Sequence, residues 1–207
     1  MADIAANTSA ELPLFPLRTV LFPGGRMGLR IFERRYLDLV RDTLRAEASF
    51  GIVWMPEGGG EVLSPGERPS SLALIGTEAH IADWDQLPDG LLGVVVEGRR
   101  RFKINHARQS AGGLYTADID WLQEQADQPL PQRSEELSDL LRQLGEHPHV
   151  QRLGMAVDVD EAGALANRLA QLLPLPEEQS YQILSIDDPL RRLDALHEVL
   201  DGLASET

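Results

Sequence analysis

The segment LPLFPLRTVLFPGG, residues 12–25, constrains the fold more than any other part of the 207-residue chain. It combines three prolines and a pair of glycines with seven large apolar side chains. Proline lacks a backbone donor, which confines it within sheets to edges, strand starts and bulges. Large apolar side chains, in contrast, favour burial. The segment therefore predicts an edge strand or an extended connection whose side chains enter a core.

The end of this segment has the composition of a type II turn. Pro23 would occupy the second position of the turn and Gly24 the third, where a positive φ favours glycine. We expect this turn to join a short strand, TVLF at 19–22, to a second strand at 27–31. Apolar and polar residues alternate in the second strand, which predicts one buried and one exposed face.

The rest of the first 122 residues is rich in strand patterns. We expect further strands at 49–55, 71–84, 91–98, 100–108 and 114–122, with a turn at Pro88-Asp89-Gly90. One helix is expected within 32–48, where Tyr36, Val40 and Leu44 recur every four residues with Leu37 beside them. Several short strands with one inserted helix predict a closed or nearly closed β-barrel.

Leucines at helical spacing dominate the later part of the chain, whereas ten of the eleven aromatic residues precede residue 123. The expected apolar stripes are Leu137, Leu140, Leu141 and Leu144; Leu165, Leu169, Leu172 and Leu173; and Leu190, Leu193, Leu196 and Leu200. Asp187 or Asp188 can cap the last helix, and Pro189 suits its first turn. These patterns predict a helical bundle.

The two compositions divide the chain into two expected domains. We predict a β-rich barrel domain at 1–122, a polar linker containing two prolines at 123–134, and an α-helical bundle at 135–207. The predicted fold class is therefore α+β.

Composition narrows the function. The chain has no cysteine, which excludes disulfides and thiolate zinc sites and suits a reducing cytoplasm. The first ten residues lack the basic start and apolar core of a secretory signal, and no apolar run approaches the roughly 18 residues of a membrane span. We expect a cytoplasmic protein without a membrane partner. The net charge of −14 argues against a general nucleic-acid binder.

Five segments carry a family resemblance. They are LPLFPLRTVLFPGG at 12–25, LRIFERRY at 29–36, IGTEAHI at 75–81, LPDGLLGVVVEGRRRFKI at 87–104, and YTADIDWL at 115–122. In order and spacing they resemble the N-terminal substrate-binding domain of the ATP-dependent Lon protease family. The resemblance implies a PUA-like β-barrel followed by helices, a module that recognises polypeptide. Cereblon contains a similar domain, but its zinc-binding cysteine region has no counterpart here.

The matching motif positions are expected to be mainly structural. They are Leu12, Pro13, Leu14, Pro16, Leu17, Phe22, Pro23, Gly24, Ile31, Phe32, Glu33, Arg35, Tyr36, Gly76, Thr77, Asp89, Gly90, Gly98, Arg101 and Phe102. The chain departs from a complete Lon protease, because Lys103, its single lysine, belongs to no Walker A loop and has no activated serine nearby. We therefore expect a non-catalytic recognition module without ATPase or protease parts and without a cofactor.

The basic run GRRRFK at 98–103 supports an alternative function. Its arginines, lysine and aromatic ring could bind RNA or a nucleotide on a PUA-like barrel. The favoured interpretation is a strand whose arginines alternate between solvent and paired carboxylates. Similarly, Glu33 and Arg35 are expected to form a structural ion pair at the corner between strand and helix.

Three other patterns resemble functional sites but have simpler explanations. His147 and His149 lack a set of partner ligands, so we expect no metal site there. Asp83 and Asp85 resemble paired catalytic carboxylates, yet a polar strand end explains them equally well, and we expect no catalytic residue. The glycine-rich EGGGE at 57–61 predicts a mobile loop tip, because its glutamates would repel phosphate.

Three large apolar residues are the candidates for binding polypeptide. Trp54, Met55 and Trp84 stand at expected strand ends beside loops, where such side chains can stay partly exposed. Packing in the core or at its rim is the favoured role for all three, and a patch that grips unfolded segments is the alternative. The expected partner is an unfolded or extended polypeptide, with a protease or chaperone as the recipient.

Overall fold

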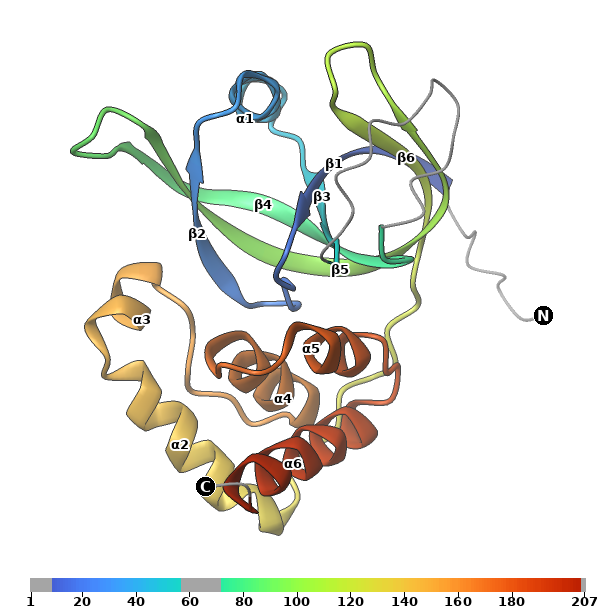
Figure 1. Ribbon diagram of the computed structural model, residues 1–207. Helices are drawn as coiled ribbons and strands as arrows, with labels where there is room; N and C mark the ends of the chain where they lie inside the picture. The colour runs from blue at the N-terminus through green and yellow to red at the C-terminus, as the bar shows by residue number, and fades with distance from the viewer. Residues whose placement is uncertain (1–8, 57–71, 206–207) are drawn as a thin grey trace.

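The computed structural model describes residues 9–56 and 72–205, and within them it is an α+β fold of six strands and six α-helices (Figure 1). The strands are β1 (Ser9–Leu17), β2 (Arg26–Ile31), β3 (Phe50–Trp54), β4 (Ile75–Gln86), β5 (Leu92–Gln109) and β6 (Tyr115–Trp121). The helices are α1 (Arg34–Ala46), α2 (Glu135–Gly145), α3 (Pro148–Leu153), α4 (Ala162–Leu172), α5 (Glu177–Leu184) and α6 (Pro189–Ser205), with a 3₁₀ turn at Gln132–Ser134. No helix in this part of the chain is long and apolar enough to cross a membrane.

The six strands form one sheet in the order β2-β5-β4-β3-β1-β6. Strand β6 also pairs with β5, so the pairing of β5, β4, β3, β1 and β6 closes on itself. All neighbours are antiparallel except β1 and β3. Strand β2 stands outside this ring because it pairs with the first part of β5. Helix α1 covers the sheet on one side, and helices α2 to α6 gather on the other (Figure 1).

The first strand accommodates both of its prolines. Pairing with β6 covers Ser9–Leu14, and pairing with β3 covers Leu14–Leu17. Pro13 and Pro16 therefore each lie where the registered pairing has one partner strand, which is the edge-like position that proline tolerates. The expected strand at 19–22 is wrong, because β1 ends at Leu17 and residues 19–22 connect it to a turn. Val20, Leu21 and Phe22 of that connection are nevertheless buried.

The predicted turn at residues 22–25 is confirmed. The Gly25 backbone N–H donates to the Phe22 carbonyl oxygen over 2.9 Å, and Gly24 has a φ of 69°. The turn lies against α4, where Arg168 Nη1 donates to the Pro23 carbonyl oxygen over 2.9 Å. In addition, the Phe22 N–H donates to Gln171 Oε1 over 2.9 Å. This part of the opening segment therefore joins the strands to the helices.

The two strands expected at 91–98 and 100–108 form the single long strand β5. Gly98 does not interrupt it. The backbone of Gly98 exchanges hydrogen bonds with Gly24 and Gly25, at 2.7 and 2.9 Å. A Cβ atom at this position would collide with the Phe22 carbonyl oxygen. Glycine is therefore required by the close approach of the turn, whereas the strand itself continues.

Helix α1 is present but buries a different stripe from the expected one. Tyr36, Leu39, Val40 and Thr43 are buried, whereas Leu37 and Leu44 are each 39% exposed. The expected four-residue repeat followed one edge of the helix. The buried stripe is instead centred on the side that faces Phe15, whose ring stacks on Tyr36 with centroids 4.0 Å apart.

The later helices pack around a common core, and the three predicted leucine stripes are confirmed as buried or partly buried. Val20 and Phe22, from the opening segment, belong to this same core. Asp188 is the cap of α6, because its carboxylate accepts from the Arg191 N–H over 2.9 Å. Asp127 accepts from the N–H groups of Gly163 and Ala164 and so caps α4 from the segment expected to be a linker.

Candidate functional site

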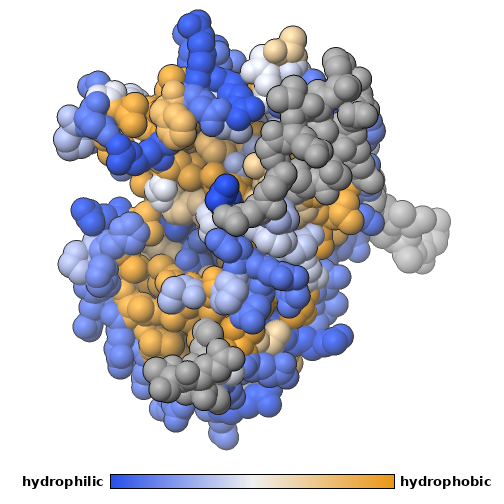
Figure 2. All heavy atoms as spheres, viewed as in Figure 1, coloured by the Kyte–Doolittle hydropathy of each residue, from blue (hydrophilic) through white to orange (hydrophobic). Residues whose placement is uncertain are grey.

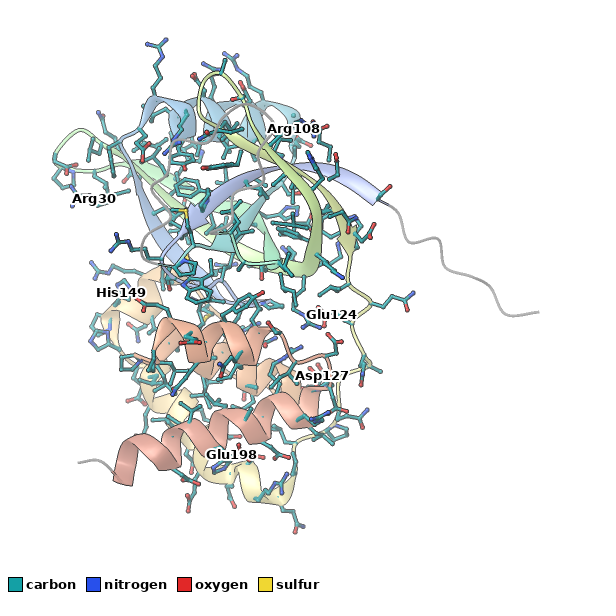
Figure 3. All side chains as sticks on the ribbon, turned by 45° about the vertical axis from the view of Figure 1, so that its right-hand side comes forward. Arg30, Arg108, Glu124, Asp127, His149 and Glu198 are labelled. Carbon is teal, nitrogen blue, oxygen red and sulfur yellow. The ribbon has the colours of Figure 1, made fainter. Side chains whose placement is uncertain are left out.

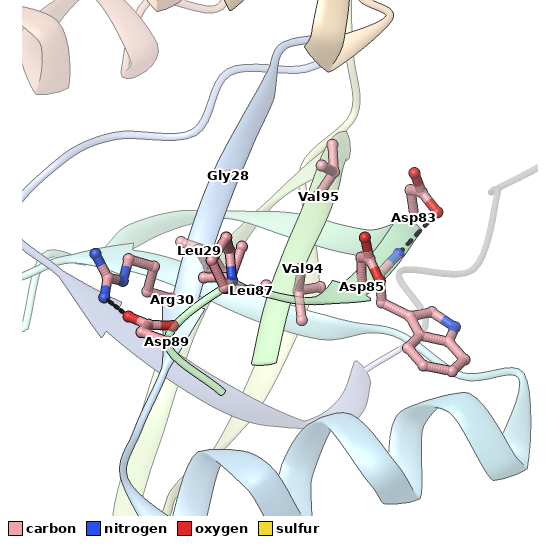
Figure 4. Close-up of a pocket in the computed structure, with 12 residues that line it drawn as sticks. Gly28, Leu29, Arg30, Asp83, Asp85, Leu87, Asp89, Val94 and Val95 are labelled. Atoms are coloured by element: carbon pink, nitrogen blue, oxygen red, sulfur yellow. Dashed lines mark hydrogen bonds and ion pairs between the residues drawn. The ribbon is translucent and has the colours of Figure 1, made fainter. Parts of the chain in front are cut away.

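A groove of about 580 Å³ crosses β2, β5 and β4 and is the best-formed candidate site (Figure 4). The strand register places Gly28, Val95 and Asp83 in one row on the same face. Gly28 supplies no side chain, and a Cβ atom there would meet nothing within 4 Å. The groove is open in that row because a glycine stands beside a valine.

The next row on the same face contains Arg30, Gly93 and Asp85. A Cβ atom at Gly93 would lie 2.8 Å from Leu87 Cδ2, so the Leu87 side chain covers this glycine. Gly28 thus leaves the sheet surface hollow in the first row, whereas Leu87 fills the space over Gly93 and forms an apolar wall beside the hollow. Figure 2 shows the surface hollowed beneath the projecting β4–β5 hairpin, with hydrophobic residues exposed there.

The row between these two points to the opposite face. It contains Leu29, Val94 and Trp84, and Val94 is buried in the core beneath α1. Figure 4 shows Val94 on one side of the strands and Asp83, Asp85 and Val95 on the other. Trp84 ends this row on β4, beyond the residues of β4 that pair with β3, so it stands at a free strand edge where it also borders the groove; it is 58% exposed. An indole at this position keeps a large apolar surface in contact with solvent.

The hairpin that carries the groove is fixed by its turn. The Leu87 N–H donates to the Leu91 carbonyl oxygen over 2.8 Å, and the Gly90 N–H donates to the Leu87 carbonyl oxygen over 2.8 Å. Gly90 has a φ of 83°, which confirms the turn predicted at 88–90. Asp89 forms an ion pair with Arg30 across the mouth of the groove (Figure 4).

The rim of the groove is acidic. Asp83 Oδ1 accepts from the Trp84 N–H over 2.9 Å, and Asp85 Oδ1 accepts from the Gln86 N–H over 2.7 Å. Both side chains are exposed. These bonds to the following residue fix the two carboxylates at the strand end, as the simpler interpretation of this sequence predicted.

The structure separates the three residues predicted to bind polypeptide. Trp54 ends β3 and Met55 follows it, and the centroid of the Trp54 ring lies 5.1 Å from that of the Tyr181 ring of α5. Trp54 is only partly exposed and packs against the helical core. Gly76, near the start of β4, pairs with Val53, the neighbour of Trp54 on β3. Trp84 is near the end of β4 and therefore lies far from Trp54 along the strand. The three side chains therefore form two separate surfaces.

The arginines of residues 98–103 do not share a surface. Arg99 and Arg100 are exposed and paired with Glu97 and Glu78, each at 3.1 Å. Arg101 is completely buried. This arrangement matches the expected alternation between solvent and paired carboxylates, and it removes Arg101 from any nucleic-acid contact.

Arg101 joins the strands to the helices. Its guanidinium donates to both oxygens of Glu124, at 2.7 and 2.9 Å, and to Asp187 at 2.9 Å. It also donates to the carbonyl oxygens of Leu184 and Ile186, at 2.7 and 3.2 Å. Figure 3 shows Glu124 at the level where the strands meet the helices. The buried position of Arg101 between the strands and the helices gives this motif residue a structural role.

Glu78 is the nearly buried carboxylate of this sheet, and its pKa reflects two opposed effects. Burial raises the pKa of Glu78, but hydrogen bonds from Arg100 and Ser49 outweigh burial and hold the pKa below its ordinary value. The Ser49 hydroxyl donates over 2.8 Å. Glu78 is therefore a structural acceptor that stays ionised.

The remaining predicted sites have structural roles. Glu33 and Arg35 form the expected ion pair at 2.7 Å, and Arg35 Nη1 also donates to the Gly113 carbonyl oxygen over 2.8 Å. His147 Nδ1 accepts from the His149 N–H over 3.2 Å at the start of α3. Within residues 9–56 and 72–205, no group of three metal-ligating side chains could hold an ion. Residues 57–61 lie outside the described part of the chain.

Most family-motif positions serve the core. Phe102 is fully buried, and a Cβ atom at Gly76 would press against its ring. Thr77 is fully buried as well. Phe32 does not serve the core, because 69% of it is exposed, and Asp89 and Gly90 lie in the exposed turn between β4 and β5. Sequence reasoning missed Gly28, Gly93 and the groove between them, although isolated glycines within strand patterns are a signal for close approach or open surface.

Comparison with known proteins identifies the family. The model of the ATP-dependent protease La (LON) substrate-binding domain matches residues 11–202. Lon protease 2 of Herpetosiphon aurantiacus is 29% identical over 99% of this chain and 26% of its own length. Lon protease of Vibrio parahaemolyticus is 27% identical over 94% of this chain and 25% of its own length. The chain thus spans about a quarter of the length of these relatives.

Solved structures agree with this assignment. The crystal structure of a Lon N-terminal domain protein from Xanthomonas campestris has a TM-score of 0.71 and 38% identity, covering 91% of this chain and 98% of that one. The N-terminal domain of Mycobacterium avium complex Lon protease shares the fold, with a TM-score of 0.56, 17% identity, and 91% and 97% coverage. The chain belongs to the family of ATP-dependent protease La (Lon) substrate-binding domains.

Proposed function

We propose that this chain is a non-catalytic module that recognises extended segments of protein substrates through the groove on β2, β5 and β4. Membership in the substrate-binding domain family supports the binding of protein substrates. The bound segment would pass to a protease or chaperone in the cytoplasm.

The observation that carries this proposal is the apolar groove bordered by Trp84. A cavity of about 580 Å³ accepts several side chains. Trp84 is 58% exposed, so burial by a ligand would remove much of its surface from water. Such burial gives roughly 25 cal/mol for each Å² of apolar surface. A short apolar segment could therefore bind without any rearrangement of the sheet.

The proposed organisation follows from the same architecture. We assign the closed pairing of five strands to a PUA-like β-barrel and the later helices to a C-terminal bundle. Residues 1–122 and 135–207 would form its two units, with 123–134 between them. Trp54 and Met55 would offer a second, weaker contact at the other end of β4.

Peptide binding to the full chain tests the proposal. A fluorescein-labelled 20-residue peptide of apolar and uncharged polar residues would be titrated while its anisotropy is measured. Wild-type protein is expected to bind it, and Trp84→Ala is expected to weaken binding about tenfold because the indole surface is lost. Leu74→Ala is the matched control, since Leu74 is 49% exposed outside the groove. Equal affinity of both variants would refute the groove as the contact surface.

A further inference from the structure

We propose that the groove selects extended segments in which a lysine or arginine stands among apolar residues. This inference rests on the proposed function and adds the chemical class of the segment. It follows from the charge of the rim, from the spacing of its carboxylates and from the open floor of the groove.

The two carboxylates of the rim are available to a ligand. Among residues 9–56 and 72–205, neither Asp83 nor Asp85 forms an ion pair, and each accepts a backbone N–H from the residue that follows it. The groove contains one cationic side chain, Arg30, which is paired with Asp89. Two negative charges thus face a largely apolar groove without a cation to balance them. A positively charged side chain complements this rim, whereas an acidic one is repelled.

The spacing of the carboxylates matches an extended ligand. Asp83 and Asp85 are two residues apart on β4, so their Cα atoms are separated by roughly 7 Å along the strand. An extended peptide that lies in the groove parallel to β4 places alternate side chains on one face at the same spacing. A basic side chain at either of two successive inward positions therefore meets a carboxylate, and its apolar neighbours face the groove.

The floor of the groove lets the peptide backbone approach. Gly28 leaves open space, whereas the Leu87 side chain packs over Gly93, so the backbone can approach at Gly28. Val95 lies opposite Gly28 on β5 and gives an apolar contact. The stem of a lysine or arginine can lie along this apolar surface while its charged end reaches the rim.

The test compares three fluorescein-labelled 13-residue peptides built from leucine, valine, serine and glycine. They differ at one central position, which is lysine, glutamine or glutamate. At low ionic strength, wild-type protein is expected to bind the lysine peptide roughly two- to fivefold more tightly than the glutamine peptide. The glutamate peptide is expected to bind most weakly. In 0.5 M salt the preference is expected to shrink, because exposed charges are screened.

Double variants show whether Asp83 and Asp85 cause the preference for the lysine peptide. Asp83→Asn with Asp85→Asn is expected to abolish the preference for lysine while keeping the affinity for the glutamine peptide. The matched control is Asp118→Asn with Asp120→Asn, which removes the same charge at the same spacing from β6. Gly28→Leu is expected to lower the affinity for all three peptides, because the leucine side chain would fill the groove. Gly202→Leu is its control, because both glycines have open space around them.

The outcomes separate this inference from the proposed function. A preference for lysine that survives in the Asp83/Asp85 variant, or that falls equally in both aspartate variants, would overturn the inference but leave peptide recognition standing. If wild-type protein binds none of the peptides, both proposals fail. Loss of the preference in the Asp83/Asp85 variant alone would support the inference.

Discussion

Replacing Arg101 by methionine gives the sharpest test of how the two parts of the molecule are held together. The side chain has no exposed surface, and its guanidinium bonds two carboxylates and two backbone carbonyl oxygens. Methionine has a similar length but no donors. The carbonyl oxygen of Leu184 would then lose its charged donor inside the protein, which costs more than losing a contact at the surface.

The expected magnitude follows from the burial of each partner. Removing one member of a buried ion pair costs roughly 3–5 kcal/mol. Glu124 is 37% exposed and Asp187 is 60% exposed, so water can solvate both carboxylates after the change. The cost therefore falls at the low end, about 3 kcal/mol, out of a total stability of roughly 5–15 kcal/mol. With a urea m-value of about 2 kcal/mol/M, the unfolding midpoint would fall by about 1.5 M.

Urea unfolding measured by tryptophan fluorescence provides the assay, because Trp54 lies against Tyr181 where the strands meet the helices. Arg99→Met is the matched control, since Arg99 is 56% exposed and pairs with Glu97 at the surface. Its expected cost is about 0–1 kcal/mol. If the Arg101 and Arg99 variants unfold at the same urea concentration, the burial argument is refuted.

Three further predictions concern stability. Gly98→Ala is expected to cost roughly 1–3 kcal/mol in urea unfolding, because the new methyl group meets the Phe22 carbonyl oxygen, while Gly28→Ala is expected to leave the midpoint unchanged. Asp188→Ala should cost about 1 kcal/mol by the same assay, because it removes the cap of α6. The lowered pKa of Glu78 stabilises the fold above its ordinary value of 4.5 and ceases to do so as the pH falls through the folded-state pKa. Glu78→Gln should therefore lose stability at pH 7, and its difference from wild type should narrow under acid; a constant difference would contradict this account.

Features decided within a few residues were predictable from the sequence. The turn at residues 22–25, the turn at 88–90 and the alternation in β2 depend on local backbone chemistry, and all are confirmed. The sequence narrowed the N-terminal cap of α6 to Asp187 or Asp188. The structure assigns the cap to Asp188, because Asp187 binds Arg101 instead.

Features set by distant partners were not predictable. Gly98 resembled a strand end, but the need for glycine comes from the turn that approaches it, more than 70 residues earlier in the chain. Arg101 follows two exposed arginines in the sequence but is itself buried, and its partner Asp187 lies 86 residues away in the chain. The groove depends on Gly28 and Gly93 lying in neighbouring rows, which is a matter of register between β2 and β5. Local sequence carries no information about that register.

Strand β5 connects the groove to the ion pairs that hold the helices, and it keeps the two apart. Gly93 and Val95 lie in the groove, and Arg101 follows six residues after Val95, roughly 20 Å farther along the strand. Substitutions that far apart and without shared partners act independently on stability. Trp84, Asp83 and Asp85 are exposed, so changes there should alter peptide binding while moving the urea midpoint very little. Arg101→Met should lower the urea midpoint but leave peptide binding unchanged wherever the protein remains folded. Recognition and stability can therefore be measured separately in this domain.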